Sequence, residues 1–216
     1  MSKETKIYLI RHGAVENPND ISYGRLPVPL SAEGKRQMRG LCEIFKAKGI
    51  KFDAIYTSPV QRAIQSAKII CDQLSVKILE LSDDLNDVDV GELEGGPMQI
   101  LKDAEYSEEN LRDMGYIIES KSAMVKRVSR LIEEVIQKHK GETVALISHG
   151  DLTRLALWSQ EFPQKAPPKN LRDADYLAVS EAVVLRFDGD RFIGREFIRR
   201  DSGQIESDNI RRTEAY

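Results

Sequence analysis

The sequence predicts an α/β fold, a three-layer α/β/α sandwich with a mostly parallel central sheet and an antiparallel edge. The parallel part is indicated by short apolar runs, such as residues 6–10 and 143–148, that alternate with longer segments of helical periodicity. Two closing apolar runs, 182–187 and 191–198, flank the Asp-Gly-Asp sequence at 188–190 and predict a hairpin. The hairpin would supply the antiparallel edge.

The expected elements follow one another as alternating strands and helices. Ser58, Pro59 and Gln61 have the types and spacing of an N-cap, a first helical position and a capping box, so we expect the second helix to begin at Ser58. The full order is strand 6–10, helix 32–48, a strand ending at 57, a helix to about 73, strand 77–81, helix 122–139, strand 143–148, helix 152–160 and the hairpin.

Chain length and local composition suggest one domain. A chain of 216 residues is within the range of a single α/β domain, which we expect over residues 1–200. A lid-like insertion is expected at about 95–120, where Glu105 to Gly115 are polar and mixed in charge. The proline-containing link 163–175 could border a pocket, and the polar tail 201–216 is expected to be disordered.

Composition argues against several classes of protein. The net charge is −3 and the 31% charged residues are mixed in sign, so no basic stripe marks a nucleic-acid partner. We find no apolar run long enough to span a bilayer and no signal peptide, which predicts a cytoplasmic protein without a membrane partner. An exposed edge of the closing hairpin would permit a homodimer.

Two cysteines and one histidine receive structural interpretations. Cys42 and Cys71 lie beside apolar neighbours in expected helices, which favours reduced, packed thiols. His139 lies near an expected helix C-terminus, where we expect a solvated cap.

A histidine followed by glycine occurs at the end of two predicted strands. The chain has only three histidines, and two of them form the pairs His12-Gly13 and His149-Gly150. Because parallel strands bind ligands beyond their carboxyl ends, both histidines should face one crevice. Each glycine lets the backbone and the imidazole approach a ligand closely. The alternative is a pair of buried core histidines.

Two arginines are placed to join these histidines. Arg62 lies about one turn into the expected helix, near an N-terminus that attracts anions, and its planar guanidinium suits phosphate. Taken alone, Arg62 would more often be a solvated helix-surface residue. Arg11 is next to His12 and carries the same ambiguity. The convergence of two arginines and two histidines on one sheet edge favours an anion-binding site.

Several separated motifs together resemble the histidine phosphatase superfamily, also called the phosphoglycerate mutase-like fold. They span about residues 5 to 160 in the order of the family. These motifs are Arg11-His12-Gly13, the loop Tyr23 to Ser31, Ser58-Pro59-x-x-Arg62-Ala63-x-x-Ser66-Ala67, Gly91-Glu92-Leu93-Glu94-Gly95, and Ser148-His149-Gly150.

The resemblance implies a phosphoric monoester hydrolase of the histidine acid phosphatase type. It assigns His12 as a nucleophile that forms a phosphohistidine, which water then hydrolyses. Arg11, Arg62 and a protonated His149 would offset the negative charge of the phosphoryl group. With arginines in the place of a divalent ion, the scheme calls for no metal and no cofactor.

The leaving alkoxide needs a proton donor near the pocket. Relatives carry a glutamate a few residues before the Gly-x-x-Glu-Gly stretch, and the matching position here holds Asp87, one methylene shorter. We expect Asp87 to be the general acid, although it could be a loop or cap residue. Other nearby carboxylates compete for the role: Asp83, Asp84, Asp89 and Glu92.

The substrate is expected to be a small phosphorylated metabolite. The insertion after Gly95 is shorter than in the mutases of the family, and its rim is not rich in lysine and arginine. Glu119-Ser120 resembles the end of a Gly-Glu-Ser sequence of relatives, with Ile118 replacing glycine. Candidate substrate contacts are Asn17, Ser22, Gly24 and Gly150, although ordinary turn chemistry explains the loop positions equally well.

Three other functions remain open at this stage. A phosphoglycerate mutase would pass the phosphoryl group to a second hydroxyl instead of to water. A non-catalytic module would bind phosphoesters without turnover, as the aspartate at the acid position would allow. A metallohydrolase would use His12 and His149 as ligands, but the surroundings supply arginines in place of further ligands.

Overall fold

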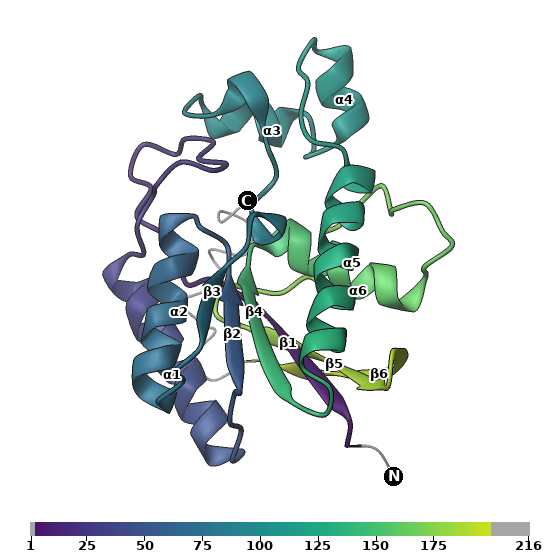
Figure 1. The fold of residues 1–216 in the computed structure, drawn as a ribbon. Coiled ribbons are helices and arrows are strands. Elements are labelled where there is room, and N and C mark those ends of the chain that lie inside the picture. Colours follow the sequence, from purple (N-terminus) through teal and green to yellow (C-terminus); the bar gives the residue numbers. More distant parts are fainter. Residues whose placement is uncertain (1–2, 200–216) are drawn as a thin grey trace.

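The computed structural model describes residues 3–199 and has helices on both sides of one sheet (Figure 1). The elements are β1 (Thr5–Arg11), α1 (Ala32–Ala47), β2 (Ala54–Thr57), α2 (Gln61–Leu74), β3 (Leu79–Leu81), α3 (Met98–Asp103), α4 (Glu108–Asp113), α5 (Lys121–Lys138), β4 (Thr143–Ser148), α6 (Gly150–Glu161), β5 (Ala182–Asp188) and β6 (Arg191–Ile198). Two short 3₁₀ helices, Asp83–Leu85 and Gly91–Leu93, lie between β3 and α3.

The sheet is mixed, as the sequence predicts. Its six strands lie in the order β3-β2-β4-β1-β5-β6. The first four are parallel, whereas β5 runs antiparallel to β1 and β6 antiparallel to β5. The expected three-layer architecture with an antiparallel edge is confirmed.

Alternation along β1 separates two hydrophobic cores. Ile7 and Leu9 point to the side covered by α5 and α6, and Tyr8 and Ile10 to the side covered by α1 and α2 (Figure 1). On the second side, the ring of Tyr8 meets that of Phe52 edge to face at a centroid distance of 5.0 Å. Both faces of the strand are therefore buried, which explains its nearly uninterrupted apolar sequence.

The second helix begins later than the capping signals predict. Its first residue is Gln61, and the N-cap is Val60, which makes no side-chain cap. The Ser58 hydroxyl accepts a hydrogen bond from the Val60 amide at 3.2 Å and donates one to Asn86 Oδ1 at 3.1 Å. The Ser58 hydroxyl, which the local sequence suggests as a helix cap, thus donates its hydrogen bond to Asn86, a residue distant in sequence.

The segment 95–120, expected from the sequence to be a lid-like insertion, has a small core of its own, although within 105–115 only Leu111 is buried. We call this segment the lid. It contains α3 and α4, which Figure 1 shows above the carboxyl ends of the strands. Leu101, Ala104 and Leu111 of the lid are buried together with Val90 and Leu93. The polar sequence hid this cluster because only one residue in three or four faces inward.

His139 is buried, so the expectation of a solvated cap is wrong. It is the C-cap of α5, but its ring contacts the Tyr56 hydroxyl (Nε2 to Oη, 2.9 Å) and Glu142 (Nδ1 to Oε2, 2.7 Å). The two cysteines are free thiols, as expected. Burial raises the pKa of Cys42 to about 11, which keeps this thiol protonated.

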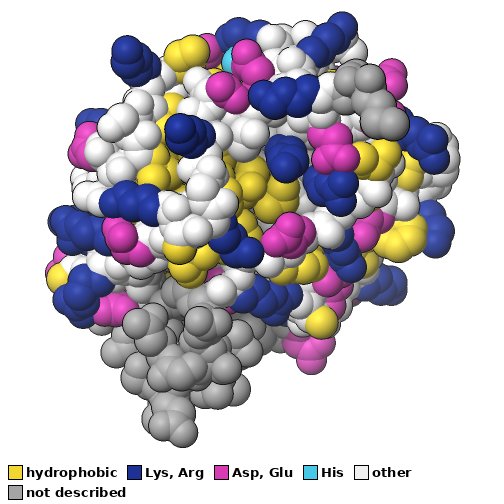
Figure 2. Space-filling model, turned by 90° about the horizontal axis from the view of Figure 1, so that it is seen from below, with side chains coloured by type: hydrophobic (Ala, Val, Ile, Leu, Met, Phe, Trp, Pro, Cys, Tyr) yellow, Lys and Arg dark blue, Asp and Glu magenta, His cyan; other side chains and the backbone are white. Residues whose placement is uncertain are grey.

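Surface charge is mixed in sign on the face shown in Figure 2, where acidic and basic side chains surround an apolar centre. Within residues 3–199, no helix is long and apolar enough to cross a membrane. The expected polar tail, 201–216, lies outside the described residues.

Two glycines let the loop after β1 pack on the start of α1. A Cβ at Gly34 would lie 2.0 Å from the carbonyl oxygen of Ala14, and a Cβ at Gly13 would lie 2.5 Å from that of Gly34. Both clashes involve backbone, which cannot rotate away as a flexible side chain can. The loop that leaves His12 therefore depends on this close approach.

We expect Gly34→Ala to lower the free energy of unfolding by at least about 2 kcal/mol, because the new methyl group overlaps the Ala14 carbonyl. Gly40→Ala in the same helix is the matched control, since nothing lies within 4 Å of its Cβ position. That change should stabilise the protein by up to about 1 kcal/mol. Urea unfolding measures both, and equal effects of the two substitutions would contradict the packing argument.

Candidate active site

The register of the parallel strands brings the two histidines together. Arg11 of β1 is paired with Ser148 of β4, so His12 and His149 both follow at the same edge of the sheet. Their ring centroids are 5.2 Å apart, and both side chains are buried. The two rings are therefore neighbours at one sheet edge, and of the two only His12 lines the cavity described below.

Hydrogen bonding fixes the tautomer of His12. Its Nδ1 lies 2.7 Å from the carbonyl oxygen of Gly13. Because a carbonyl only accepts, Nδ1 carries the proton and the lone pair is on Nε2. The Nε of Arg62 donates to that lone pair at 3.2 Å. His12 therefore presents a nucleophilic nitrogen beside a permanent positive charge.

Arg62 is fully buried and joins separate segments of the site. One terminal nitrogen, NH2, donates to the Gly24 carbonyl at 2.6 Å and to Asp87 Oδ2 at 2.8 Å. Its guanidinium also lies over the Tyr23 ring, 4.7 Å from the centroid. Arg62 is thus an interior residue of the site, which excludes the solvated helix surface left open by the sequence.

The neighbours of His149 fix its tautomer as well. Its Nε2 lies 3.0 Å from the Ser58 hydroxyl, whose own proton is donated to Asn86. Nε2 therefore carries the proton, and the lone pair is on Nδ1. That atom lies 3.3 Å from Asp87 Oδ2, without the alignment of a hydrogen bond. A proton taken up by either group would let the two share it.

Burial and nearby arginines act on both histidine rings. Burial, followed by the charge of Arg62, lowers the pKa of His12 well below its ordinary value of 6.5. Burial and the charges of Arg62 and Arg11 do the same for His149. Both shifts favour the neutral rings in the ligand-free site, and the protonated His149 that was expected beside a bound phosphoryl group stays a prediction.

Asp87 is held in the site by its backbone. Its carbonyl oxygen accepts hydrogen bonds from Arg25 Nε at 3.1 Å and from an Arg127 nitrogen at 3.3 Å. Glu119 pairs with both of these arginines, at 3.0 Å and 2.8 Å. The competing carboxylates Asp83, Asp84, Asp89 and Glu92 do not line the cavity described next.

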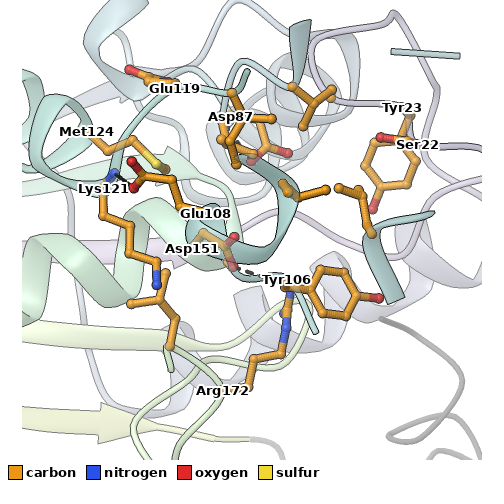
Figure 3. A pocket seen from close by; sticks show the side chains of 18 of the residues that line it. Ser22, Tyr23, Asp87, Tyr106, Glu108, Glu119, Lys121, Met124, Asp151 and Arg172 are labelled. Carbon is orange, nitrogen blue, oxygen red and sulfur yellow. Dashed lines mark hydrogen bonds and ion pairs between the residues drawn. The ribbon is translucent and has the colours of Figure 1, made fainter. Parts of the chain in front are cut away.

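A cavity of about 120 Å³ opens in front of His12. Arg11 borders it. Its NH1 donates to the Leu177 carbonyl at 2.8 Å, and its buried Nε has no hydrogen-bond partner. The wall consists of Arg11, His12, Ser22, Tyr23, Gly24, Asp87, Val88, Val90, Met98, Leu101, Tyr106, Glu108, Leu111, Ile118, Glu119, Lys121, Met124, Gly150, Asp151, Leu171, Arg172 and Tyr176 (Figure 3).

Three of the four predicted substrate contacts border this cavity. They are Ser22, whose buried hydroxyl has no hydrogen-bond partner, Gly24 and Gly150. A Cβ at Gly150 would lie 2.2 Å from the Tyr176 hydroxyl, so only glycine fits there. Asn17 does not line the cavity. Both ends of its amide bond the backbone of Ile21, at 3.0 and 3.2 Å, and close a turn.

The sequence does not identify the far wall of the cavity. Tyr106, Glu108 and Lys121 come from the lid and the start of α5, and Asp151 follows Gly150. The link after α6 was expected to border a pocket, and it contributes Leu171 and Arg172. These residues have no motif spacing, because lid and link meet only in the folded chain. Within residues 3–199, no cluster of three or more histidine, cysteine or carboxylate side chains could hold a metal ion.

Comparisons with known proteins agree with this geometry. Phosphoglycerate mutase-like protein 4 of Arabidopsis thaliana is 27% identical over 205 residues, which cover 87% of this chain and 82% of that protein. Among solved structures, Bacillus stearothermophilus YhfR has a TM-score of 0.74 at 22% identity, covering 88% of this chain and 94% of that one. A Bacillus subtilis protein named uncharacterized phosphatase PhoE is 31% identical over 147 residues, which cover 68% of this chain and 72% of that protein. The model of the histidine phosphatase superfamily (branch 1) matches residues 7–197. The chain therefore belongs to the histidine phosphatase superfamily.

Proposed function

We propose that this protein is a metal-independent hydrolase of small phosphomonoesters that works through a phosphohistidine at His12. The observation that best supports this proposal is that the lone pair of the His12 ring lies on Nε2. The Nδ1–H···O=C bond to Gly13 leaves Nε2 unprotonated, Arg62 Nε is the donor that an incoming phosphoryl group would take over, and Arg11 and Arg62 supply positive charge beside the ring.

On substrate binding, the phosphoryl group would replace Asp87 as the anion paired with Arg62. In the ligand-free site, Arg62 NH2 is neutralised by Asp87 at 2.8 Å. A phosphoryl group beside His12 would take over that guanidinium, together with the unpartnered Nε of Arg11 and the N-terminus of α6, which begins at Gly150. Asp87 would then lose its counter-charge and remain 3.3 Å from His149 Nδ1, a setting that favours a shared proton.

The first chemical step would transfer the phosphoryl group to the enzyme. His12 Nε2 forms a bond to phosphorus while the ester P–O bond breaks. The proton on Asp87 goes to the departing alkoxide oxygen. In the second step, water attacks phosphorus, the P–N bond breaks, and a water proton returns to Asp87 as inorganic phosphate leaves. Each step needs a positive site for the phosphoryl oxygens, which Arg11 and Arg62 supply.

We expect His12→Ala to lower phosphate release by at least about a thousandfold, because no other lone pair occupies that position. Release should be measured in excess chelator with a panel of phosphomonoesters, with His139→Gln as control, since His139 lies outside the cavity. An alkaline quench of wild-type protein during turnover should trap phosphate on His12. Isomerisation of phosphoglycerate primed by bisphosphoglycerate, without net phosphate release, would indicate the mutase instead. Loss of activity in chelator would favour a metallohydrolase.

Asp87→Asn should separate proton donation from binding. For alkyl esters we expect kcat to fall by about 10²- to 10⁴-fold, because an amide cannot protonate the alkoxide. For p-nitrophenyl phosphate, whose leaving group needs no proton, the fall should be much smaller. Asp89→Asn, two residues away and outside the cavity, is the matched control. Equal losses with both esters would argue against Asp87 as the acid, and tight ester binding without turnover by the wild type would favour a binding module.

The lowered pKa of His12 predicts how its contribution to stability depends on pH. Below pH 6.5, the unfolded chain binds a proton at this residue that the native site excludes. Wild-type stability should therefore fall, relative to His12→Gln, by up to about 1.4 kcal/mol per pH unit as the pH drops through 6.5 toward the folded pKa. Urea unfolding between pH 7.5 and 5 measures the difference, and parallel curves would show that the folded pKa is not lowered.

A further inference from the structure

The wall of the cavity changes character away from His12. At the end next to the nucleophile it is formed by Arg11, Asp87 and Gly150. Beyond that end it contains eight apolar side chains without aromatic rings: Val88, Val90, Met98, Leu101, Leu111, Ile118, Met124 and Leu171. A phosphomonoester bound at His12 would place its alcohol group against this part of the wall.

Most of these side chains belong to the core of the lid. Leu101 and Leu111 are among its five buried members, and Met98 and Ile118 are only partly buried and pack against them. The cavity therefore lies along an open side of a very small hydrophobic cluster. An apolar group that fills the cavity would pack against this cluster, and each of its methylenes that becomes buried would add favourable transfer free energy.

The main positive charge of the far wall, the guanidinium of Arg172, already has aromatic and acidic neighbours. The guanidinium of Arg172 lies over the ring of Tyr106 at 4.3 Å and over that of Tyr176 at 4.7 Å. Figure 3 shows it beside the Tyr106 ring. One of its nitrogens is 3.6 Å from Asp151, which also accepts the hydrogen bond of Tyr176 at 2.8 Å. Tyr106 reaches this position with φ of 54°, a conformation rare for tyrosine.

The other charged groups of the far wall also have partners. Lys121 Nζ donates to the carbonyl oxygens of Pro168 and Lys169. Glu119 is bound by two arginines, and Glu108 accepts hydrogen bonds from Arg112 and from the amide of Lys121. A second anionic group on the substrate would have to displace one of these contacts, whereas an apolar group would displace none.

We propose that the substrates are phosphomonoesters of apolar alcohols, with an alkyl or aryl group that fills the space beside the lid. This proposal rests on the proposed function and adds the class of leaving group. It ranks such esters above phosphorylated hydroxy acids and amino acids, whose carboxylates would meet a wall of aliphatic and already paired side chains.

The test is a series of ethyl, butyl and hexyl phosphates, in which the reacting oxygen is the same and only the chain grows. We expect kcat/KM to rise by about two- to fourfold for each methylene that enters the cavity. Phosphoserine and 3-phosphoglycerate, assayed alongside, should be poorer substrates than butyl phosphate.

Two pairs of variants locate the effect in the lid. Met98→Gln should reduce the gain in kcat/KM from ethyl to hexyl phosphate. Met114→Gln is the matched control, because Met114 is 47% exposed and lies outside the cavity. Ile118→Thr and its neighbour Ile117→Thr form the second pair, since Ile117 is 82% exposed.

The outcomes distinguish this inference from the proposed function. Phosphate release that is independent of chain length, or is faster from the carboxylated esters, would overturn the apolar subsite and leave the hydrolase intact. No release from any ester would overturn the proposed function itself. If Met98→Gln and Met114→Gln alter the chain-length gain equally, the apolar subsite in this wall would also be overturned.

Discussion

The arrangement of the site depends on the buried guanidinium of Arg62. A permanent charge with no exposed surface is tolerated only where every side of it is hydrogen bonded or stacked. Arg62 achieves this with His12, the Gly24 carbonyl, Asp87 and the face of Tyr23. These partners come from two connections, the one between β1 and α1 and the one between β3 and α3, so satisfying one charge also fixes the relative positions of His12, Asp87 and the loop at Tyr23 and Gly24.

The parallel sheet explains why the sequence predicts this centre well. Strand period and the glycines after His12 and His149 are local signals, and the observed pairing of Arg11 with Ser148 in the parallel sheet places both histidines at one edge. Predictions from local sequence patterns were wrong where a side chain binds a residue that is distant in sequence. Ser58 has the pattern of an N-cap but binds His149 and Asn86, and His139 has the pattern of an exposed cap but bonds Tyr56.

The far wall could not be predicted for a different reason. Its members come from the lid, the start of α5 and the link after α6, and each segment is polar or irregular in sequence. Arg172 would be taken for a surface residue, yet it lies between the rings of Tyr106 and Tyr176. Such stacking depends on the position of two loops in space, for which periodicity and spacing give no signal.

Asp87, the proposed proton donor, is positioned through its main chain. Asp87 Oδ2 lies 2.8 Å from Arg62 and 3.3 Å from His149 Nδ1, although its carboxyl group is one methylene closer to the backbone than that of a glutamate. The loop makes this possible, because Arg25 and Arg127 bond the Asp87 carbonyl from one side while Glu119 holds both arginines. Two arginines and the carboxylate of Glu119, which itself lines the cavity, thus hold the main chain of Asp87 in place. The position of the Asp87 carboxylate therefore depends on the ion pairs that hold its main chain.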